Sequence, residues 1–259
     1  MQPSFLHLGN DRKLAHHVHE GKSPCVIFHG GFKSDMEGGK ALAVEAFCKE
    51  RGQRFIRFDY TGHGQSSGAF TDGTIGSWKQ DALDIIDQLG GEKNILIGSS
   101  MGAWISLLVA LERKEKVDGL ITIAAAPDFT ERRIWKPAPE EKRRELMEKG
   151  VYYEPSCYGD EPYPITRALV EDGRNHLLMD SSIPLDIPVR LLHGMVDEDV
   201  SWQTSQEILE KLSSDDVELK LIKNAGHRLS EPEQLRLLCQ TLENLLDRIS
   251  PTDTDGQSV

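Results

Sequence analysis

Short apolar runs alternate with helix-like stretches along most of this chain. Six runs rich in β-branched residues predict strands: Cys25–Phe28, Arg54–Phe58, Asn94–Ile97, Gly119–Ala124, Val189–Leu192 and Val217–Ile222. Four stretches carry apolar residues at helical spacing: Lys40–Glu50, Ile75–Leu89, Trp202–Leu212 and Glu233–Ile249. Continuous apolar strands that alternate with helices indicate an α/β fold, with a mostly parallel central sheet and helices on both faces. The opening segments Ser4–Leu8 and Lys13–His19 alternate in polarity and predict an antiparallel hairpin at a sheet edge.

One region interrupts this alternation. Segment 128–187 is rich in Pro, Glu, Arg and Tyr and is too long for an ordinary connection between two strands. We interpret it as a small cap inserted into a single domain that spans residues 1–250. The alternative is a solvated helical excursion without function. Residues 251–259 are expected to form a disordered tail.

The composition limits the classes of binding partner and the cellular compartment that we expect for this chain. The net charge of −12 argues against nucleic acid or an anionic membrane as the main partner. No apolar run reaches the roughly 18 residues that a membrane span needs, and the N-terminus lacks the pattern of a secretory signal. The four cysteines, with no C-x-x-C pair, indicate reduced and mostly buried thiols, and the cytoplasm is the expected location. They are Cys25, Cys48, Cys157 and Cys239.

The sequence GSSMG, residues 98–102, joins the strand-like NILI to the helix-like AWISLLVAL. The plain interpretation is a tight turn of small residues. The other is the nucleophile elbow, in which G-x-S-x-G joins a strand to a helix and exposes a serine above the sheet. Ser100 is then the nucleophile, and the N-terminus of the helix that begins at Met101 favours negative charge beside it. Ser99 is interpreted as a turn residue.

In folds with this elbow, the acid follows the serine and the histidine comes last. The histidines after Ser100 are His176, His193 and His227. His227 follows the last predicted strand, where it could reach over the sheet, so it is the predicted general base; otherwise it is a surface loop residue. Two aspartates follow the strand at 189–192. Asp197, in a G-x-x-D-x-x-V frame, is preferred as the orienting acid, and Asp199 is the alternative or a helix cap.

An oxyanion hole needs two donors close to the nucleophile. The backbone N–H of Met101 is the first. The second is expected from the loop in VIFHGGFKSD, with Phe32 preferred and Gly31 as the alternative. Asp59 and His63, in RFDYTGHGQSSG, are expected to tie their loop together by hydrogen bonds rather than to act in catalysis.

The sequence offers little sign of a metal or a cofactor. His16, His17 and His19 form a histidine-rich strand, and no third ligand is evident beside the two that would share a face. We interpret them as a strand surface. No glycine-rich stretch has the form of a phosphate-binding P-loop. We expect no cofactor and no metal.

Several stretches together resemble a known family. GGFKSDMEGGKALAVEAFCKERGQRFIRFDYTGHGQSSG, GSSMGAW, RLLHGMVDEDVSWQTS and AGHRL are similar to the α/β-hydrolases related to the mitochondrial mycophenolic acid acyl-glucuronide esterase and palmitoyl-protein thioesterase. The resemblance includes the predicted cap and implies a triad on Ser100, Asp197 and His227. Animal members have Pro-Gly-Tyr where this chain has Gly30-Gly31-Phe32. They also carry a transit segment, and its lack here favours a bacterial, cytoplasmic member.

The sequence therefore predicts a serine hydrolase of esters or thioesters that forms an acyl-serine intermediate. The alternatives are a specialist for acyl glucuronides or acyl-protein thioesters, a peptidase, and a non-catalytic binding scaffold; a dehalogenase would need a carboxylate at position 100. In the cap, four tyrosines are candidates for lining an apolar slot that receives the acyl chain: Tyr152, Tyr153, Tyr158 and Tyr163. Four arginines are candidates for binding an acidic leaving group: Arg132, Arg133, Arg143 and Arg144. The preferred interpretation of these arginines is a solvated face paired with glutamates. The substrate is expected to be a small molecule or an acylated protein, and the oligomeric state stays open.

Overall fold

The computed structural model describes residues 2–155 and 162–249. Its main sheet has eight strands in the order β1-β2-β4-β3-β5-β6-β9-β10. Their bounds are β1 Ser4–His7, β2 Lys13–His19, β3 Lys22–His29, β4 Gln53–Phe58, β5 Asn94–Ser99, β6 Val117–Ile123, β9 Val189–Gly194 and β10 Val217–Ile222. Strands β3, β4, β5, β6, β9 and β10 run parallel to one another, and β1 and β2 form an antiparallel hairpin at one edge. The predicted sheet and edge hairpin are confirmed.

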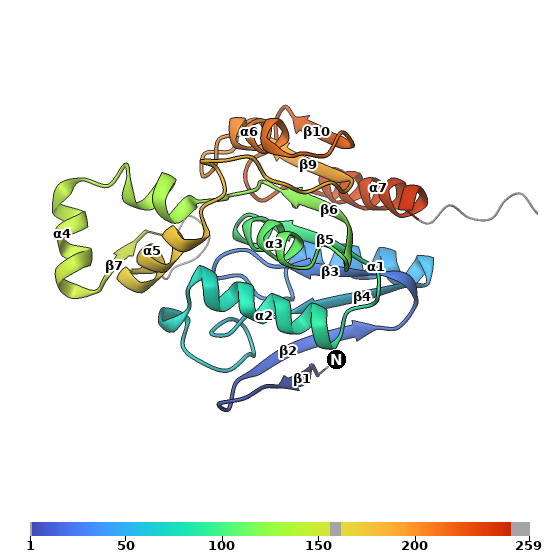
Figure 1. Cartoon of the computed structure of the whole chain (residues 1–259), viewed down its shortest axis with the longest axis horizontal. Coiled ribbons are helices and arrows are strands. Elements are labelled where there is room, and N and C mark those ends of the chain that lie inside the picture. Colours follow the sequence, from blue (N-terminus) through green and yellow to red (C-terminus); the bar gives the residue numbers. More distant parts are fainter. Residues whose placement is uncertain (1, 156–161, 250–259) are drawn as a thin grey trace, which may run out of the picture.

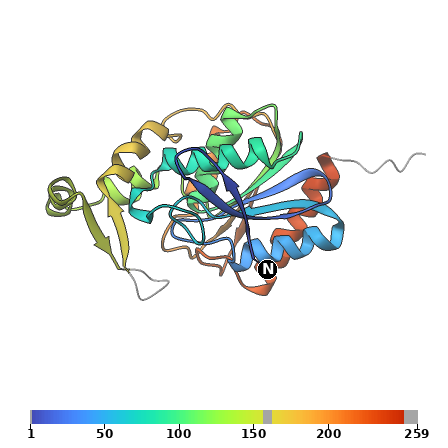
Figure 2. The same cartoon turned by 90° about the horizontal axis from the view of Figure 1, so that it is seen from below.

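Helices cover both faces of this sheet (Figures 1 and 2). They are α1 Gly39–Arg51, α2 Ile75–Gln88, α3 Met101–Glu112, α6 Gln203–Lys211 and α7 Pro232–Ile249. α1 and α7 pack against one face, and α2, α3 and α6 pack against the other. α3 is apolar on all sides because almost every residue of it is buried between the sheet and α2. A mostly parallel sheet with helices on both faces is the architecture that the sequence predicted.

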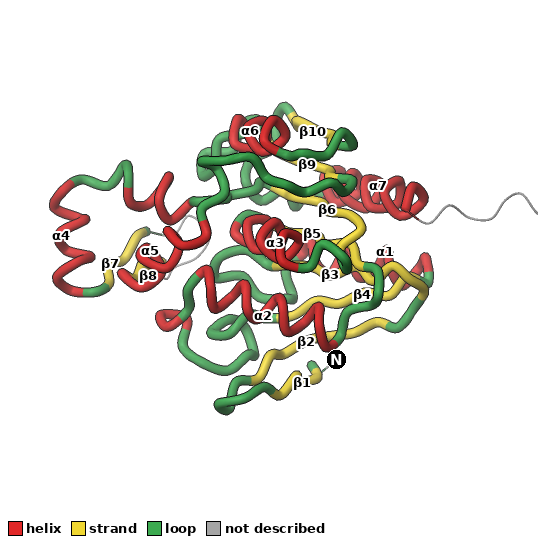
Figure 3. Tube along the Cα trace, in the orientation of Figure 1, coloured by secondary structure: helices red, strands yellow, loops and turns green. Residues whose placement is uncertain are grey.

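The predicted cap segment leaves the sheet after β6 and returns to it at β9. It contains α4 Glu140–Lys149, the hairpin of β7 Val151–Glu154 and β8 Tyr163–Thr166, and α5 Arg167–Gly173. The short helical turns η2 Thr130–Trp135 and η3 Arg174–His176 flank these elements, and η1 Phe70–Asp72 precedes α2. The segment extends to the left of the sheet in Figures 1 and 3. The predicted tail, like Cys157 and Tyr158, lies outside the described residues, and the division into domain, cap and tail stays a prediction.

Asp128 links the two ends of this segment. Its buried carboxylate accepts hydrogen bonds from the backbone N–H groups of Leu178 (2.8 Å) and Met179 (2.9 Å), fifty residues further along the chain. Burial raises its pKa although these two donors stabilise the charged form. Nearby, Trp104 of α3 donates to the carbonyl of His176 at 3.0 Å. The two ends of the segment are therefore bound to each other, and its returning end is also bound to α3.

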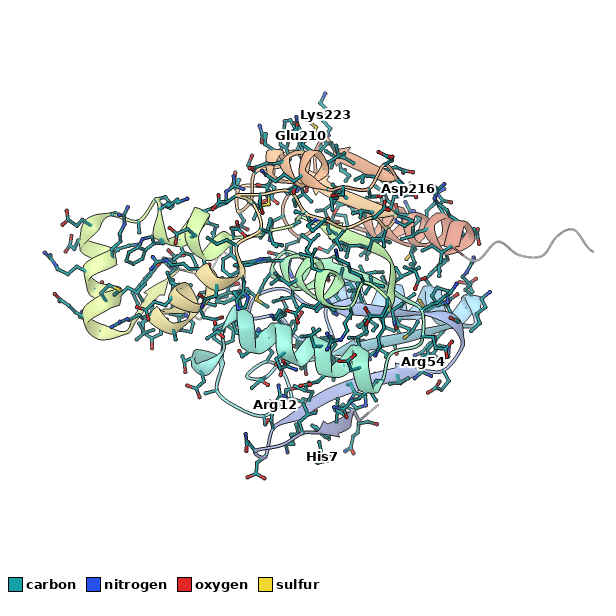
Figure 4. The ribbon with its side chains drawn as sticks, in the orientation of Figure 1. His7, Arg12, Arg54, Glu210, Asp216 and Lys223 are labelled. Atoms are coloured by element: carbon teal, nitrogen blue, oxygen red, sulfur yellow. The ribbon has the colours of Figure 1, made fainter. Side chains whose placement is uncertain are left out.

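A buried carboxylate also holds the edge hairpin in place. Asp81 on α2 accepts hydrogen bonds from Arg12 (2.6 Å) and from the backbone N–H of Thr61 (2.7 Å). Arg12 lies in the turn between β1 and β2 (Figure 4) and also pairs with Asp84. Burial raises the pKa of Asp81 to about 6, against the opposing effect of its donors. The hairpin is thus tied to α2 by a guanidinium and not only by its strand pairing.

The histidines of β2 differ from the prediction. His16 and His17 are buried rather than part of an exposed strand surface, because β2 lies between β1 and β4 and the loop after β3 approaches it. His17 Nε2 lies 3.7 Å from Glu37 in that loop. Burial lowers the pKa of both imidazoles. Among the described residues, no group of possible metal ligands includes these histidines.

Buried histidines make stability depend on pH. Burial lowers the pKa of His29 to about 3 and that of His63 to about 4, from an ordinary value near 6.5. The unfolded chain therefore binds more protons than the folded one below pH 6.5. We expect the free energy of unfolding to fall as the pH drops from 6.5 towards 4, with a contribution of up to about 1.4 kcal/mol per pH unit from each ring. Urea unfolding at pH 7, 6, 5 and 4.5 measures this slope, and a flat free energy between pH 6.5 and 5 would contradict it.

Candidate active site

The loops that leave the carboxyl ends of the parallel strands meet around Ser100. In open α/β sheets this is the edge where ligands bind. Ser100 stands between β5 and α3 with φ 55° and ψ −115°, a backbone conformation that few non-glycine residues adopt. Its N–H donates to the carbonyl of Ile123 (2.9 Å), and its own carbonyl accepts from Ala103 and Ala126. The strained turn is therefore held on both sides by the backbone.

The two glycines of the G-x-S-x-G motif are required by close packing. A Cβ on Gly98 would lie 2.4 Å from the carbonyl oxygen of Gly102, and one on Gly102 would lie 2.2 Å from that of His29. Both distances are far inside van der Waals contact with backbone that cannot move freely. The motif thus brings strand, helix and the loop after β3 closer together than any side chain would allow.

We expect Gly102→Ala to cost about 1–3 kcal/mol of stability and to reduce hydrolase activity, because overpacking must displace the loop after β3. Thermal unfolding and ester hydrolysis measure the two effects. Gly9→Ala is the matched control, since a Cβ there meets no atom within 4 Å. Equal stability and activity in the two variants would show that the close approach is not needed.

A chain of hydrogen bonds runs from Ser100 through His227 to Asp197. The Nε2 atom of His227 lies 3.0 Å from Ser100 Oγ, and its Nδ1 lies 2.8 Å from Asp197 Oδ2. His227 lies in the loop after β10, and Asp197 lies in the loop after β9. The structure therefore joins the three residues that the sequence proposed, although they are far apart in the chain. Their catalytic roles stay a prediction.

The carboxylate of Asp197 is fully buried and accepts four hydrogen bonds. Oδ1 accepts the backbone N–H groups of Asp199 (2.9 Å) and Val200 (2.8 Å), and Oδ2 lies within reach of His227 and His193. Burial alone would raise the pKa of Asp197. The hydrogen bonds from the two histidines and the charge of His227 outweigh burial and hold the pKa below its ordinary value. Asp197 is thus a preorganised anion.

Asp199, the alternative acid, has different partners. Its carboxylate pairs with Arg133 of η2 at 3.2 Å, while its backbone N–H serves Asp197. Asp197, Asp199 and His227 each offer one possible metal-ligating atom within 4.8 Å of the others, the one such group among the described residues. Asp197 and His227 are hydrogen-bonded to each other, and this bond explains why their ligating atoms lie close together.

A cavity of about 350 Å³ opens beside Ser100. Phe32 and Met101, the residues predicted to supply the oxyanion donors, both line it. The N–H of Met101 lies in the first turn of α3, where it has no acceptor within the helix. The alternative donor, Gly31, lies against the nucleophile, because a Cβ on it would be 3.7 Å from the Cβ of Ser100. The assignment of these donors stays a prediction.

The loop that carries Phe32 is braced by the loop after β4. Asp59 accepts from the N–H of Met36 (2.7 Å) with one oxygen and from that of Gln65 (2.8 Å) with the other. His63 accepts from the N–H of Lys33 at 3.2 Å. The prediction that Asp59 and His63 tie this loop together is confirmed, and their hydrogen bonds extend to the loop after β3.

One wall of the cavity is apolar and comes partly from the cap segment. Its lining includes Phe32, Phe129, Ile134, Tyr163 and Ile165. The ring of Phe32 makes edge contacts with Phe129 (5.7 Å between centroids) and Tyr163 (5.9 Å). The lining residues Phe129, Ile134 and Ile165 were not selected from the sequence, because an isolated aromatic or aliphatic residue in a segment of mixed composition gives no sign of facing a cavity.

The tyrosines and arginines that the sequence singled out in the cap segment do not all lie at the cavity. Of the described tyrosines, Tyr163 lines the cavity, Tyr152 is buried in its own hairpin and bonded to Glu154 at 3.0 Å, and Tyr153 is 61% exposed. Arg132 pairs with Glu207 on α6 (2.8 Å). Arg143 bonds to backbone carbonyls and stacks on Trp135. These partners differ from the glutamates of α4 that the sequence suggested.

The cavity lining also includes charged residues, which we call the polar wall. Lys40, at the start of α1, lines it and donates to the carbonyl of Arg228. Burial, and then the charge of Arg228, lowers the pKa of Lys40 to about 8. Lys33, Arg133 and Arg228 also line the cavity, together with Asp35 and Asp199. The cavity beside Ser100 is therefore lined by an apolar set of residues and by a charged set, and Lys33 of the charged set lies over the ring of Tyr163.

Comparison with known proteins identifies the family. The family model described as "alpha/beta hydrolase fold" matches residues 24–153. Human "Palmitoyl-protein thioesterase ABHD10, mitochondrial" is 41% identical over 248 residues, which cover 95% of this chain and 81% of that protein. The chain belongs to the α/β-hydrolase family. The resemblance inferred from the sequence is therefore confirmed, and so is the prediction of an enzyme of the hydrolase class.

Two solved structures extend the likeness to the whole fold of this α/β-hydrolase. Mouse "Alpha/beta hydrolase domain-containing protein 10" superposes with a TM-score of 0.90 at 40% identity, covering 96% of this chain and 100% of that one. A "putative hydrolase from Agrobacterium vitis S4" superposes with a TM-score of 0.89 at 40% identity, covering 94% and 97%. Both coverages include the cap segment.

The predicted cytoplasmic location is wrong by these comparisons, because the curated relatives at 40–42% identity are named mitochondrial. The prediction had rested partly on the cysteines. Scattered free thiols indicate a reducing compartment but do not distinguish one reducing compartment from another. Cys25 and Cys48 are free and buried, and burial raises the pKa of both thiols. Among the described residues, no helix has the length and apolar character to span a membrane.

Proposed function

We propose that this α/β-hydrolase cleaves carboxylic esters or thioesters through an acyl intermediate on Ser100. The observation that carries the proposal is the hydrogen-bonded series from Ser100 Oγ through His227 to the buried carboxylate of Asp197. A serine hydroxyl is a weak nucleophile until a base accepts its proton. Here the base lies within hydrogen-bond distance, and an anion faces its other nitrogen.

Each residue then has a role in two half-reactions. Ser100 Oγ attacks the carbonyl carbon while His227 Nε2 accepts its proton. The tetrahedral adduct collapses, the bond to the leaving group breaks, and His227 returns the proton to the departing oxygen or sulfur. A water molecule, deprotonated by His227, then attacks the acyl carbon and releases the acid and free Ser100. Asp197 keeps the Nδ1–H tautomer and stabilises the imidazolium.

The negative oxygen of both adducts needs donors that are in place beforehand. We assign this task to the backbone N–H groups of Met101 and Phe32. Met101 benefits from the dipole of α3, and the position of Phe32 is supported by the bracing of its loop through Asp59 and His63. One such donor contributes about a hundredfold to a thousandfold in rate.

The substrate divides between the two walls of the cavity. We propose that segment 128–187 acts as a cap, and that its Phe129, Ile134, Tyr163 and Ile165 receive the acyl chain. The polar wall then faces the leaving group. The names of the relatives favour thioesters among the candidate substrates, because the curated ones are called palmitoyl-protein thioesterases. Acyl glucuronides are the second candidate, since a glucuronate would find Lys40 in the polar wall.

The test is hydrolysis of matched esters and thioesters, from acetyl to palmitoyl, with Ser100→Ala as the control. We expect turnover of both series, with a chain-length optimum that shifts when Phe129→Ala or Ile165→Ala enlarges the apolar wall. An optimum unchanged by both variants would contradict the assignment of that wall to the acyl chain. If the wild type hydrolyses neither series nor an acyl glucuronide, the binding-scaffold alternative would replace the proposal.

A further inference from the structure

A second histidine, His193, contacts the same Oδ2 atom of Asp197 as His227 does. It is the penultimate residue of β9, and its side chain has no exposed surface. Its Nε2 lies 3.1 Å from Asp197 Oδ2 and 3.0 Å from the carbonyl oxygen of Val200. Its Nδ1 lies 2.7 Å from the hydroxyl of Ser205, in the first turns of α6. Both ring nitrogens are therefore engaged.

These partners fix where the proton of the ring lies. A carboxylate oxygen and a carbonyl oxygen can only accept, so Nε2 must carry the hydrogen and donate to them. In the neutral ring Nδ1 is then an acceptor, and the hydroxyl of Ser205 donates to it. A charged ring would compete with His227 for the same carboxylate oxygen, and a fully buried imidazolium is costly. The geometry therefore selects the neutral Nε2–H tautomer, held by Ser205.

We infer that His193 is a positioning residue, which, with Ser205 as the group that locks its tautomer, orients Asp197 and moderates its pull on His227. This inference rests on the proposed function. The hydrogen bonds form a series of five residues from α6 to the nucleophile: Ser205, His193, Asp197, His227 and Ser100. Because the carboxylate of Asp197 also accepts the hydrogen bond from His193, it stabilises the imidazolium of His227 less strongly than it would alone.

The effect on pH dependence follows from this sharing. Without the donor from His193, the carboxylate would interact more strongly with the imidazolium of His227. The acid limb of kcat/KM, which reports the base of the free enzyme, would then move to higher pH. A merely structural role for His193 would lower stability and rate without moving the limb.

The surroundings add few other charges. On the same loop, Asp199 is paired with Arg133 at 3.2 Å. Across the cavity, Lys40 is bound to a backbone carbonyl in the loop after β10. The residue opposite His193 on β10 is the apolar Leu221. On α6, Glu207 is held by Arg132 at 2.8 Å. The carboxylate of Asp197 is thus acted on directly by the N–H of the neutral His193 ring and by the hydrogen bond and charge of His227.

The experiment compares His193→Leu, His193→Gln and Ser205→Ala by pH profiles of kcat/KM with a short-chain ester. We expect His193→Leu to lose about 10- to 100-fold in kcat, as for the loss of one hydrogen bond to a charged group, and to move the acid limb upward by about half a pH unit or more. His193→Gln keeps an amide N–H at the position of Nε2 and should restore most of both. Ser205→Ala should shift the limb in the same direction but less.

Ser106→Ala is the matched control. Ser106 lies 2.7 Å from the Nδ1 of another buried histidine, His29, which is not bonded to Asp197. We expect it to lower the melting temperature as Ser205→Ala does and to leave the acid limb in place. The inference is overturned if the acid limb moves equally in Ser205→Ala and Ser106→Ala. It is also overturned if the limb stays in place in Ser205→Ala, His193→Gln and His193→Leu alike.

A second measurement does not depend on activity. Nitrogen-15 NMR of histidine-labelled protein, with His193→Gln to assign the signal, should give His193 as a neutral Nε2–H ring at pH 7. An Nδ1–H or doubly protonated ring would overturn the inference. If Ser100→Ala abolishes hydrolysis while His193 has the wrong tautomer, the inference alone fails. If Ser100→Ala leaves hydrolysis intact, the proposed function itself fails.

Discussion

Replacing Ser100 with alanine is expected to lower kcat for ester hydrolysis by about a millionfold, to the level of the background reaction. The variant keeps the fold but has no oxygen to accept the acyl group. Its melting temperature should stay near that of the wild type, because the strained turn is held by backbone hydrogen bonds to Ile123 and Ala126 that the substitution leaves in place. Initial rates with a chromogenic ester, and a thermal melt, measure both.

Ser99→Ala is the matched control for this prediction. Ser99 is the neighbouring serine of the same motif, and its hydroxyl has no assigned role in the reaction. We expect its rate to stay within about tenfold of the wild type, since most substitutions outside a mechanism change little. A Ser100→Ala enzyme that retains even one hundredth of the wild-type kcat would rule out the acyl-serine mechanism.

Asp197→Asn is expected to lower kcat by about ten thousandfold. An asparagine in this position can donate a hydrogen bond to Nδ1 of His227 and so favours the tautomer that cannot accept the proton of Ser100. It also removes the buried anion that stabilises the imidazolium. Part of the loss should be recovered at high pH, where hydroxide can replace the base. Rates from pH 6 to 10 measure this dependence.

The comparison with Asp199→Asn decides between the two carboxylates. The carboxylate of Asp199 pairs with Arg133, while its backbone N–H supports Asp197. The amide variant keeps that N–H, so its rate should stay within about tenfold of the wild type. If Asp199→Asn proved the more damaging variant, the assignment of the acid would be reversed.

The sheet could be predicted because its strands are buried on both faces. The run Cys25–Phe28 is apolar throughout and Asn94–Ile97 is apolar after its first residue, and such runs occur where helices cover both sides of a parallel sheet. The position of the site followed from chain order. The loops after β5, β9 and β10 leave the same edge of the sheet, so Ser100, Asp197 and His227 could be grouped before any coordinates were known.

What the sequence did not reveal depends on contacts between distant segments. His193 looked like the last residue of an apolar strand, and nothing in its neighbours points to Ser205 on a helix that begins ten residues later. The burial of His17 depends on Glu37 in the loop after β3, which lies twenty residues further along the chain. Arg132 and Arg133 of the cap pair with Glu207 of α6 and with Asp199 of the loop after β9, and helix periodicity does not predict such partners.

The cavity wall is the clearest case of this limit. Phe129 and Ile165 lie 36 residues apart in the chain, and both line the cavity. They meet there because the segment folds back on itself, with the carboxylate of Asp128 bound to the backbone N–H of Leu178. The spacing of apolar residues predicts faces of single helices and strands. It does not predict a surface assembled from a turn, a hairpin and a loop.

The central claim is that the acyl group passes through Ser100, and trapping it there is the most direct test. The enzyme is mixed with a short-chain activated ester, quenched in acid within milliseconds and analysed as intact protein and as peptides by mass spectrometry. The account predicts one added acyl mass per chain, located on Ser100 and absent from Ser100→Ala. Turnover without any adduct, or an adduct on another residue with unchanged kinetics in Ser100→Ala, would contradict it.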